Sequence, residues 1–216
     1  MENGKREFIE FMLASDVLRF GEFTTKSGRL SPYFINTGNY RTGKQISKLS
    51  EFYARSIQDS GVAFDALFGP AYKGIPLAAS AAAKLWELYG IDKPYFFNRK
   101  EAKDHGEGGS LVGYRPKDGD RVVIVEDVIT AGTAVRETVP VLKCAADVTL
   151  SDMFISVNRM EVGQGDRTAT QEILDEFGIT VHAIVTVCDI RNYLDTAGSR
   201  EQVELMEAYM EKYCRF

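Results

Sequence analysis

Short apolar runs alternate with stretches of helical periodicity over most of the chain. The clearest run is residues 122–125, Val-Val-Ile-Val, in which every residue is β-branched. An uninterrupted β-branched run is typical of a strand buried on both faces of a parallel sheet. The pattern also predicts strands at 64–68, 95–97, 149–157 and 181–187, with helices at 75–88, 132–145 and 169–177 between them. This alternation predicts an α/β fold with a central parallel sheet flanked by helices.

The first 40 residues follow another pattern. Apolar residues at helical spacing predict a helix over 5–18, and the segments 20–24 and 30–35 predict a hairpin around a glycine-containing turn. We expect this helix and hairpin, within residues 1–40, to form a small hood over the carboxyl edge of the sheet. A helix covering 46–57 follows the hood. A last helix is predicted at 200–213, with an apolar face suited to docking. Residues 1–216 are expected to form one domain, because this length suffices for a single core.

Composition excludes several classes of function. A net charge of −5 offers no general basic surface for nucleic acid, and no apolar stretch approaches the ~20 residues of a membrane span. The polar start of the chain lacks the apolar core of a signal peptide. The three cysteines lack metal-ligand spacing, so we expect reduced thiols in a cytoplasmic protein.

Three single residues carry structural expectations. Pro140 falls inside a predicted helix and is expected to kink it. Trp86 is expected to pack against the protein, and His182, in an apolar strand, to be a core or edge residue with its hydrogen bonds satisfied rather than a ligand.

Two adjacent carboxylates, Glu126 and Asp127, end the central strand and precede a Thr/Gly-rich turn. Polar groups at the carboxyl end of a parallel strand lie where open α/β sheets bind ligands. The backbone N–H groups of 130–133, at the start of a helix, suit a phosphate. The carboxylates suit sugar hydroxyls or Mg²⁺. The alternative is an ordinary strand–turn–helix connection with exposed acids. Neither a Walker A loop nor a dinucleotide fingerprint occurs in the chain.

Two further segments carry cations beside glycines. Residues 68–76 follow a predicted strand, and their glycines and prolines force a tight loop that carries Lys73. Such a loop is a plausible seat for a diphosphate. Residues 98–113 hold Arg99, Lys100, Lys103 and His105 among four glycines, which suits a lid that is mobile when empty and closes on a polyanion. The alternative for both segments is a solvated surface loop.

These motifs resemble a known family. Residues 125–134 resemble the phosphoribosyl-diphosphate signature of the type I phosphoribosyltransferases. Residues 68–76 and 98–109 extend the resemblance to the orotate phosphoribosyltransferases, since sister families lack the string Arg-Lys-Glu-Ala-Lys-Asp-His-Gly-Glu-Gly-Gly of 99–109. Residues 20–23, 26–29 and 31–34 agree too, and the resemblance runs from about Phe8 to about Tyr193. It implies the type I phosphoribosyltransferase fold. The implied reaction is Mg²⁺-dependent transfer of ribose 5-phosphate from phosphoribosyl diphosphate to orotate. Its products are orotidine 5′-monophosphate and diphosphate, in pyrimidine biosynthesis.

The resemblance also implies roles for individual residues. Those implied to be catalytic are Lys26, Lys73, Lys103 and Asp127. Those implied to bind phosphoribosyl diphosphate are Lys26, Tyr72, Lys73, Arg99, Lys100, Lys103, His105, Glu126, Asp127, Val128, Ile129, Thr130, Ala131, Gly132, Thr133 and Ala134. Those implied to bind orotate are Phe34, which would stack on it, Ile35, Thr130 and Arg159. Ile35 stands where a second aromatic residue is common in the family, and Glu126 where an aspartate is frequent.

The family further implies a homodimer with shared active sites. Arg99, Lys103 and His105 would reach the partner's site, whereas Lys100 would serve its own subunit. The peptide bond between Ala71 and Tyr72 would be cis. Mg²⁺ would be held mainly by the diphosphate and the ribose, and no protein ligand to it is assigned.

Two other functions compete with this interpretation. A type I transferase for a purine or for uracil would share the phosphate motifs, but 99–109, Phe34 and Arg159 argue against it. Without the family, Arg159 could be an ordinary surface cation. A regulator that senses phosphoribosyl diphosphate and binds nucleic acid should carry a basic face or an extra domain, which the acidic chain lacks.

Overall fold

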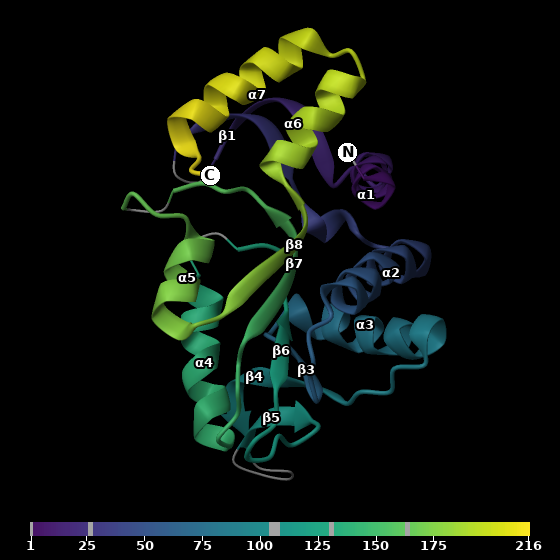
Figure 1. The fold of residues 1–216 in the computed structure, drawn as a ribbon, viewed down its shortest axis with the longest axis vertical. Helices are drawn as coiled ribbons and strands as arrows, with labels where there is room; N and C mark the ends of the chain where they lie inside the picture. Colours follow the sequence, from purple (N-terminus) through teal and green to yellow (C-terminus); the bar gives the residue numbers. More distant parts are fainter. Residues whose placement is uncertain (1, 26–27, 104–108, 130–131, 163–164) are drawn as a thin grey trace.

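The computed structural model describes residues 2–25, 28–103, 109–129, 132–162 and 165–216. Its elements, in chain order, are α1 (Asn3–Ala14), β1 (Leu18–Thr24), β2 (Leu30–Ile35), the short 3-10 helix η1 (Thr37–Asn39), α2 (Gly43–Ser60), β3 (Ala66–Gly69), α3 (Gly74–Tyr89), β4 (Tyr95–Lys103), β5 (Gly109–Gly113), β6 (Val122–Val125), α4 (Thr133–Ala145), β7 (Asp152–Asn158), α5 (Ala169–Phe177), β8 (Thr180–Thr186), α6 (Val187–Thr196) and α7 (Arg200–Tyr213). Figure 1 labels the helices and strands by these names.

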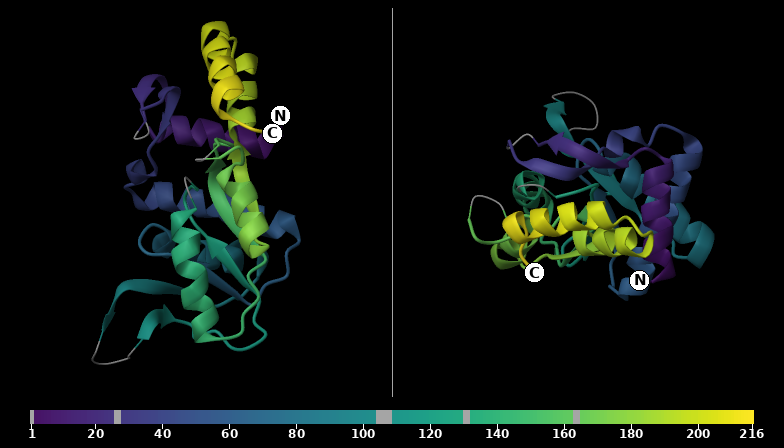
Figure 2. Two further views of the ribbon diagram at one scale, coloured as in Figure 1. Left: turned by 90° about the vertical axis from the view of Figure 1, so that its left-hand side faces the viewer. Right: turned by 90° about the horizontal axis from the view of Figure 1, so that it is seen from above.

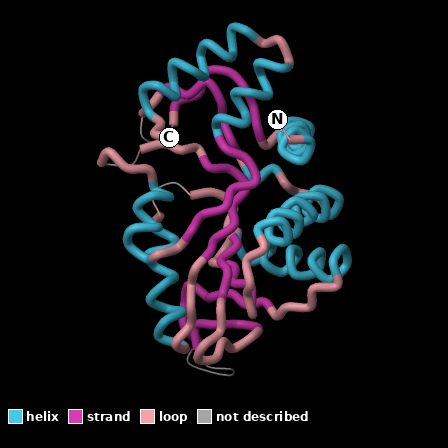
Figure 3. Tube along the Cα trace, in the orientation of Figure 1, coloured by secondary structure: helices cyan, strands magenta, loops and turns pink. Residues whose placement is uncertain are grey.

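A six-stranded sheet lies at the centre of the molecule, in the order β5-β4-β3-β6-β7-β8. Strands β4, β3, β6, β7 and β8 run parallel, and β5 pairs antiparallel to β4 at one edge. Helices α2 and α3 cover one face of the sheet and α4 and α5 the other (Figures 1 and 3). The predicted α/β class with a mainly parallel sheet is therefore confirmed.

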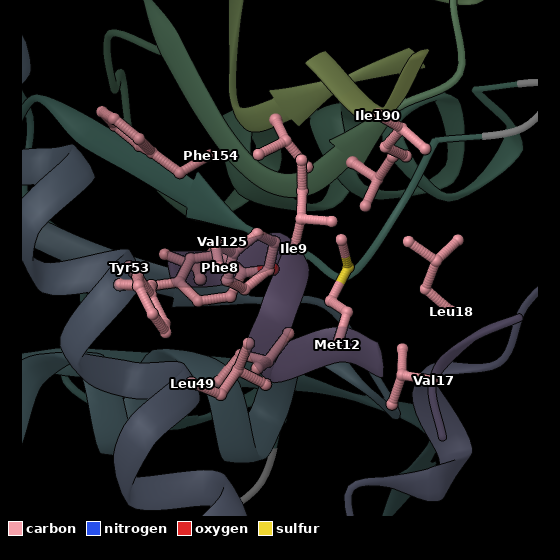
Figure 4. Packing of buried hydrophobic residues seen from close by; sticks show 14 of the residues in the cluster. Phe8, Ile9, Met12, Val17, Leu18, Leu49, Tyr53, Val125, Phe154 and Ile190 are labelled. Atoms are coloured by element: carbon pink, nitrogen blue, oxygen red, sulfur yellow. The ribbon is translucent and has the colours of Figure 1, made fainter. Parts of the chain in front are cut away.

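The central strand shows why both faces of the sheet are apolar. All four residues of β6 are buried. Val123 and Val125 join the core cluster that includes α2 and α3, whereas Val122 and Ile124 join the cluster that includes α4. Side chains alternate between faces along a strand, so one β-branched run supplies two cores. Figure 4 shows the first cluster, where Phe8 of α1 lies beside Tyr53 of α2 and Val125, and Met12 lies toward Val17 and Leu18.

A hood covers the carboxyl side of the sheet and contains both ends of the chain (Figures 1 and 2). It combines α1 and the β1–β2 hairpin, as predicted, with α6 and α7. The ring of Tyr209 on α7 meets that of Tyr33 on β2 edge-on, with centroids 5.9 Å apart. The apolar face of α7 is buried through Val203 and Met206, which confirms its docking role. No helix within the described ranges is long and apolar enough to cross a membrane.

Several boundaries differ from the predictions. The first helix ends at Ala14 rather than at residue 18, because Leu18 already pairs with Ile35 in the hairpin. Residues 98–113, predicted as a loop, continue β4 to Lys103 and form β5 from Gly109; the intervening 104–108 lie outside the described residues. The loop prediction is wrong for the described parts, because pairing with β5 satisfies the backbone groups along the β4 edge.

Three remaining points concern helix α6, Pro140 and His182. Helix α6 was not predicted; it begins where β8 ends, and Thr186 caps it in a capping box with Asp189. Helix α4 runs from Thr133 to Ala145 with Pro140 inside it. The ring of His182 stacks on Phe154 at 4.7 Å and its Nε2 lies 2.6 Å from Asp152 Oδ1, so its structural role is confirmed.

Candidate active site

The acid pair lies at the carboxyl end of β6, and its backbone is held by one helix and by the neighbouring strand. The Tyr53 hydroxyl of α2 donates to the Glu126 carbonyl at 2.7 Å. Ser156 of β7 donates to the Asp127 carbonyl through its hydroxyl at 2.6 Å and its backbone N–H at 2.9 Å. Glu126 and Asp127 are only 7% and 8% exposed. The carboxylates are therefore fixed at the sheet edge rather than free in solvent.

Asp127 is at the centre of a hydrogen-bonded cluster. Its Oδ2 accepts from Lys73 Nζ and from Thr37 Oγ1, both at 2.7 Å, and Lys73 also donates to Thr37 Oγ1 at 2.9 Å. Its Oδ1 accepts from the Val128 N–H at 2.8 Å. Burial by itself raises the pKa of Asp127, but the hydrogen bonds from Lys73 and Thr37 outweigh it, and the pKa lies below its usual range. Asp127 is thus an anion at neutral pH, paired with the cation of the glycine-rich loop.

Glu126 has the opposite electrostatic state. Burial raises its pKa to about 8, and the neighbouring charge of Asp127 adds to the shift. Its Oε1 accepts from the Asp127 N–H at 2.9 Å. One of the two adjacent acids is therefore charged at pH 7 while the other is largely protonated.

Replacing Glu126 by glutamine should remove a pH-dependent loss of stability. A carboxyl whose folded pKa is raised binds its proton more tightly in the folded state, so the free energy of unfolding falls as pH rises from about 4.5 toward 8. At pH 8 we expect Glu126→Gln to exceed the wild type by roughly 1–3 kcal/mol, and at pH 5 to match it. Urea unfolding at both pH values measures this, with the exposed Glu204→Gln as control; an equal difference at both would contradict it.

The loop after β3 approaches the end of β6 closely, and its glycines make this possible. A Cβ added at Gly69 would lie 2.2 Å from the Gly74 carbonyl oxygen, and one at Gly74 would lie 2.8 Å from the Val125 oxygen. The Ala71–Tyr72 peptide bond is cis, as the resemblance implied. The Ala71 N–H donates to the Asn98 side chain at 2.8 Å, and the Tyr72 side chain is 69% exposed. This loop places Lys73 against Asp127.

An alanine at Gly69 should disturb this loop. Because the added carbon meets backbone rather than a flexible side chain, we expect Gly69→Ala to lower the free energy of unfolding by about 1–3 kcal/mol and to reduce activity. Gly43→Ala is the matched control, since nothing lies within 4 Å of its added carbon. Urea unfolding compares them, and equal stabilities of the two variants would refute the close-approach argument.

The turn after the acid pair leads into α4. Gly132 has φ +70° and caps the helix, and Thr133 and Ala134 form its exposed first turn. Val128 forms an isolated parallel bridge with Val157, and Ile129 is half-buried against the α4 side of the core. Thr130 and Ala131 lie outside the described residues. The first N–H groups of a helix lack partners within the helix and are available to an anion, so phosphate binding by this turn stays a prediction.

The residues expected to bind orotate are not all brought together. Tyr33, fully buried, and Phe34, 41% exposed, alternate along β2 and therefore face opposite sides of the hairpin. Arg159 covers the Tyr33 ring at 4.5 Å, whereas Phe34 stacks on Phe23 at 5.4 Å on the other side. Ile35 is partly buried against the core. The alternative of a surface cation is wrong for Arg159, whose side chain is only 16% exposed.

The predicted lid cations lie on or beyond β4. Arg99 is half-buried on this strand, and Lys100 and Lys103 belong to it by their backbone. The side chains of Lys100 and Lys103, like all of Lys26 and His105, lie outside the described residues. The expected mobility of the lid falls on the same part of the chain.

A cavity of about 200 Å³ opens beside the Asp127–Lys73 pair. Its lining includes Thr37, Tyr40, Leu49, Leu77 and Ser156. The sequence analysis missed Thr37, Tyr53 and Ser156 as site residues. All three act by hydrogen bonds between elements distant in sequence, and no local pattern marks them.

The protein itself offers few metal ligands here. Within the part of the chain that the structure describes, no three His, Cys, Asp or Glu side chains are grouped to hold a metal ion. The acid pair supplies two carboxyl groups, one of them with a pKa of about 8. Mg²⁺ accepts a site with one or two carboxylates when substrate oxygens complete its shell, so the residues fit a metal that is held mainly by substrate.

Comparison with known proteins agrees with this geometry. The family model of the phosphoribosyl transferase domain matches residues 36–146. The orotate phosphoribosyltransferase of Clostridium acetobutylicum is 56% identical over 195 residues, covering 90% of this chain and 87% of that protein. That of Thiobacillus denitrificans is 51% identical over 214 residues, covering 99% of each. A crystal structure of orotate phosphoribosyltransferase from Francisella tularensis has a TM-score of 0.89 at 40% identity, covering 97% of this chain and 100% of that one. These similarities favour orotate over a purine or uracil and catalysis over nucleic-acid sensing. The chain belongs to the phosphoribosyl transferase domain family and, within it, to the orotate phosphoribosyltransferases of pyrimidine biosynthesis.

Proposed function

We propose how the residues of this site divide the work of the orotate phosphoribosyltransferase reaction. Ribose 5-phosphate passes from phosphoribosyl diphosphate to N1 of orotate, which gives orotidine 5′-monophosphate and diphosphate. The observation that carries the proposal is the cluster in which Lys73 and Thr37 both bond Asp127 Oδ2. An ammonium and a carboxylate that pair with each other can each take a substrate group, the cation a diphosphate and the anion the ribose hydroxyls.

Charge decides which groups stabilise the transition state. When the bond from ribose C1 to diphosphate breaks, positive charge develops on the sugar and negative charge on the leaving group. Asp127, held ionised by its neighbours, lies on the sugar side, and Lys73 and Lys26 stabilise the leaving diphosphate. Orotate enters as an anion, so its attack needs no strong general base. The catalytic residues in this proposal are Lys26, Lys73, Lys103 and Asp127.

The other proposed substrate contacts are those to the 5-phosphate, the diphosphate and orotate. The turn from Glu126 to Ala134 holds the 5-phosphate through the N–H groups at the start of α4. Tyr72 and Lys100 contact the diphosphate of their own subunit. Phe34, Ile35, Thr130 and Arg159 form the orotate pocket. Because Phe34 and Arg159 lie on opposite faces of the hairpin here, orotate binding would require the hood to shift or Phe34 to contact orotate from across the hairpin edge.

Mg²⁺ is the cofactor in this proposal. When bound to the diphosphate and the ribose, it would neutralise part of the negative charge on the leaving diphosphate. The two carboxyl groups at the end of β6 suit this role without forming a complete metal site.

The active form is proposed to be a homodimer with shared sites. Arg99, Lys103 and His105 of one subunit would cover the site of the other. Exposed large apolar side chains close in sequence support self-association: Trp86, Leu88 and Tyr89 at the end of α3 and Tyr95 at the start of β4 are each 38% to 61% exposed. The expectation that Trp86 packs within the chain is therefore wrong, since 61% of it is exposed.

The domain organisation, compartment and partners of the enzyme are proposed from its core, its cysteines and its net charge. Residues 1–216 would act as one domain, since one core cluster joins the hood to the sheet. The three cysteines are free thiols, as suits a cytoplasmic protein. Neither nucleic acid nor a membrane is a proposed partner, in keeping with a net charge of −5.

The direct test is the fall in ultraviolet absorbance of orotate when enzyme, Mg²⁺ and phosphoribosyl diphosphate are mixed. Hypoxanthine, adenine and uracil serve as competing bases. We expect turnover with orotate that stops when Mg²⁺ is chelated. Turnover that persists under chelation would remove Mg²⁺ from the proposal, and faster turnover with another base would contradict the roles of Phe34 and Arg159.

A further inference from the structure

Arg159 is held in place on three sides. It follows β7, and its Nε and Nη2 both contact Glu161 Oε1, at 2.7 and 2.6 Å. The ring of Tyr33 lies against the guanidinium face at 4.5 Å from the ring centroid. Nη2 also donates to the Tyr209 hydroxyl at 3.4 Å. Within the described residues, Nη1 makes no hydrogen bond, so it is the nitrogen left for a ligand.

The chain turns between Arg159 and Glu161, at Met160. Met160 has φ +54°, and its N–H bonds the Asn158 side chain at 2.8 Å. The turn sets the carboxylate of Glu161 along the Nε–Nη2 edge of the guanidinium, which is the geometry of a strong charge-assisted pair.

The C-terminal segment closes this arrangement. The Tyr209 hydroxyl donates to Glu161 Oε1 at 2.7 Å, and burial together with this hydrogen bond raises the pKa of Tyr209 to about 12, so the hydroxyl keeps its proton. Beyond α7, Cys214 forms a β-bridge with Glu161, and the Cys214 thiol lies 3.5 Å from the Arg159 carbonyl. The end of the chain therefore holds both the side chains and the backbone of 159–161.

We propose that Glu161 and Tyr209 are positioning residues for Arg159: they fix the guanidinium so that its Nη1 receives the carboxylate of orotate. This inference rests on the proposed role of Arg159 in binding orotate. It gives α7 a part in base recognition, in addition to its docking on the hairpin. The base specificity of the enzyme then depends on residues from β2, the turn after β7, and the last helix.

A competing role for Glu161 makes the opposite prediction. If Glu161 merely occupies the anion site of Arg159 when orotate is absent, its removal frees the arginine and tightens orotate binding. If Glu161 positions the guanidinium, Glu161→Gln leaves an arginine with a weaker and less directional partner. We expect the KM for orotate to rise about tenfold in this variant. A lowered KM would overturn the proposal.

The sharper variant is Tyr209→Phe, which removes one hydroxyl and keeps the ring against Tyr33. We expect the KM for orotate to rise about five- to tenfold, while the KM for phosphoribosyl diphosphate and kcat stay within twofold. Tyr213→Phe, on the same helix, is the matched control, because its hydroxyl makes no hydrogen bond among the described residues. An unchanged orotate KM, or equal changes in both KM values, would overturn the positioning role.

Arg159→Ala separates failure of this inference from failure of the proposed site. If Arg159→Ala leaves the orotate KM unchanged, the role of Arg159 itself is wrong. If it raises that KM but Tyr209→Phe does not, only the positioning role is wrong. In the Arg159→Ala background, Tyr209→Phe should add less than a twofold effect, because a residue that acts through Arg159 has nothing left to position. Additive effects of the two changes would also overturn the inference.

Discussion

Asp127→Asn should lower kcat/KM by about 10²–10³-fold, because it removes the negative charge that faces the developing cation on the ribose. Asparagine keeps the shape of the side chain and the oxygen that accepts from the Val128 N–H. It cannot pair ionically with Lys73 or stabilise positive charge as an anion does. Steady-state kinetics with both substrates measures the effect.

Asp152→Asn is the matched control for this result. Asp152 is half-buried and hydrogen-bonded to His182 at the start of β7, the opposite end of a strand from the site. Its activity should stay within twofold of the wild type.

The stability of Asp127→Asn should change little, since the side chain of Lys73 is 61% exposed and such pairs contribute roughly 0–1 kcal/mol. Because the folded pKa of Asp127 is lowered, that contribution is present at neutral pH and is lost as pH falls below its usual range. Near-wild-type turnover of Asp127→Asn would contradict the assignment of the acid pair.

Mixing two inactive variants should restore activity if the sites are shared across a two-fold dimer. Lys103→Ala disables the lid, and Asp127→Asn disables the core. In a mixed dimer, the subunit with Lys103→Ala has an intact core and receives the intact lid of its partner. With random exchange, half the dimers are mixed and each has one good site, so roughly a quarter of wild-type activity should return.

The control for the mixing experiment is Lys103→Ala mixed with itself after the same exchange treatment. A lid that served its own subunit would leave every site in the mixture defective. Activity that stays at the level of the separate variants, after exchange has been verified by labelled subunits, would rule out the shared site. It would leave the transferase activity standing. Dilution below the dimer dissociation constant should also abolish wild-type activity.

The central sheet and the phosphate motifs could be predicted because their signals are local. The β-branched run 122–125 favours a strand buried on both faces of a parallel sheet. The two acids that follow it must then lie at the carboxyl end of the strand, where open α/β sheets bind ligands. Apolar residues at helical spacing likewise marked α2 over 46–57, although the helix begins earlier, at Gly43 after the Thr42 cap. In these segments, propensity and tertiary packing agree.

The segment 98–113 misled prediction because its composition and its pairing disagree. Glycines and charges are typical of loops, yet the β4 edge needs a partner strand, and Gly113 pairs with Phe96 in the ladder. A Cβ at Gly113 would lie 2.7 Å from the Tyr95 carbonyl, so this glycine permits a close strand approach rather than a flexible turn. Tertiary pairing decided the structure here, and a single sequence carries no direct signal of it.

The supporting residues of the site were beyond prediction for a different reason. Thr37, Tyr53 and Ser156 meet the acid pair from segments separated by up to 90 residues in the chain. In the sequence, Tyr53 and Ser156 look like ordinary helix and strand residues, and Thr37 falls between two predicted elements. Glu161 lies two residues from Arg159, but the contacts that join both to Tyr209 come from a helix 48 residues further along the chain, and no local pattern indicates them.

The contact between Tyr33 and Tyr209 also sets the order in which the enzyme can be completed on the ribosome. Tyr209 is synthesised about 175 residues after Tyr33. At roughly 5–20 residues per second, the hairpin waits about 10–35 s for the helix that covers it. During that interval the sheet and the phosphate-binding turn can already pack, whereas Arg159 still lacks Tyr209 beside it. The base-recognition half of the enzyme is therefore the last to mature, and the nascent chain carries the hairpin without its covering helix for most of its synthesis.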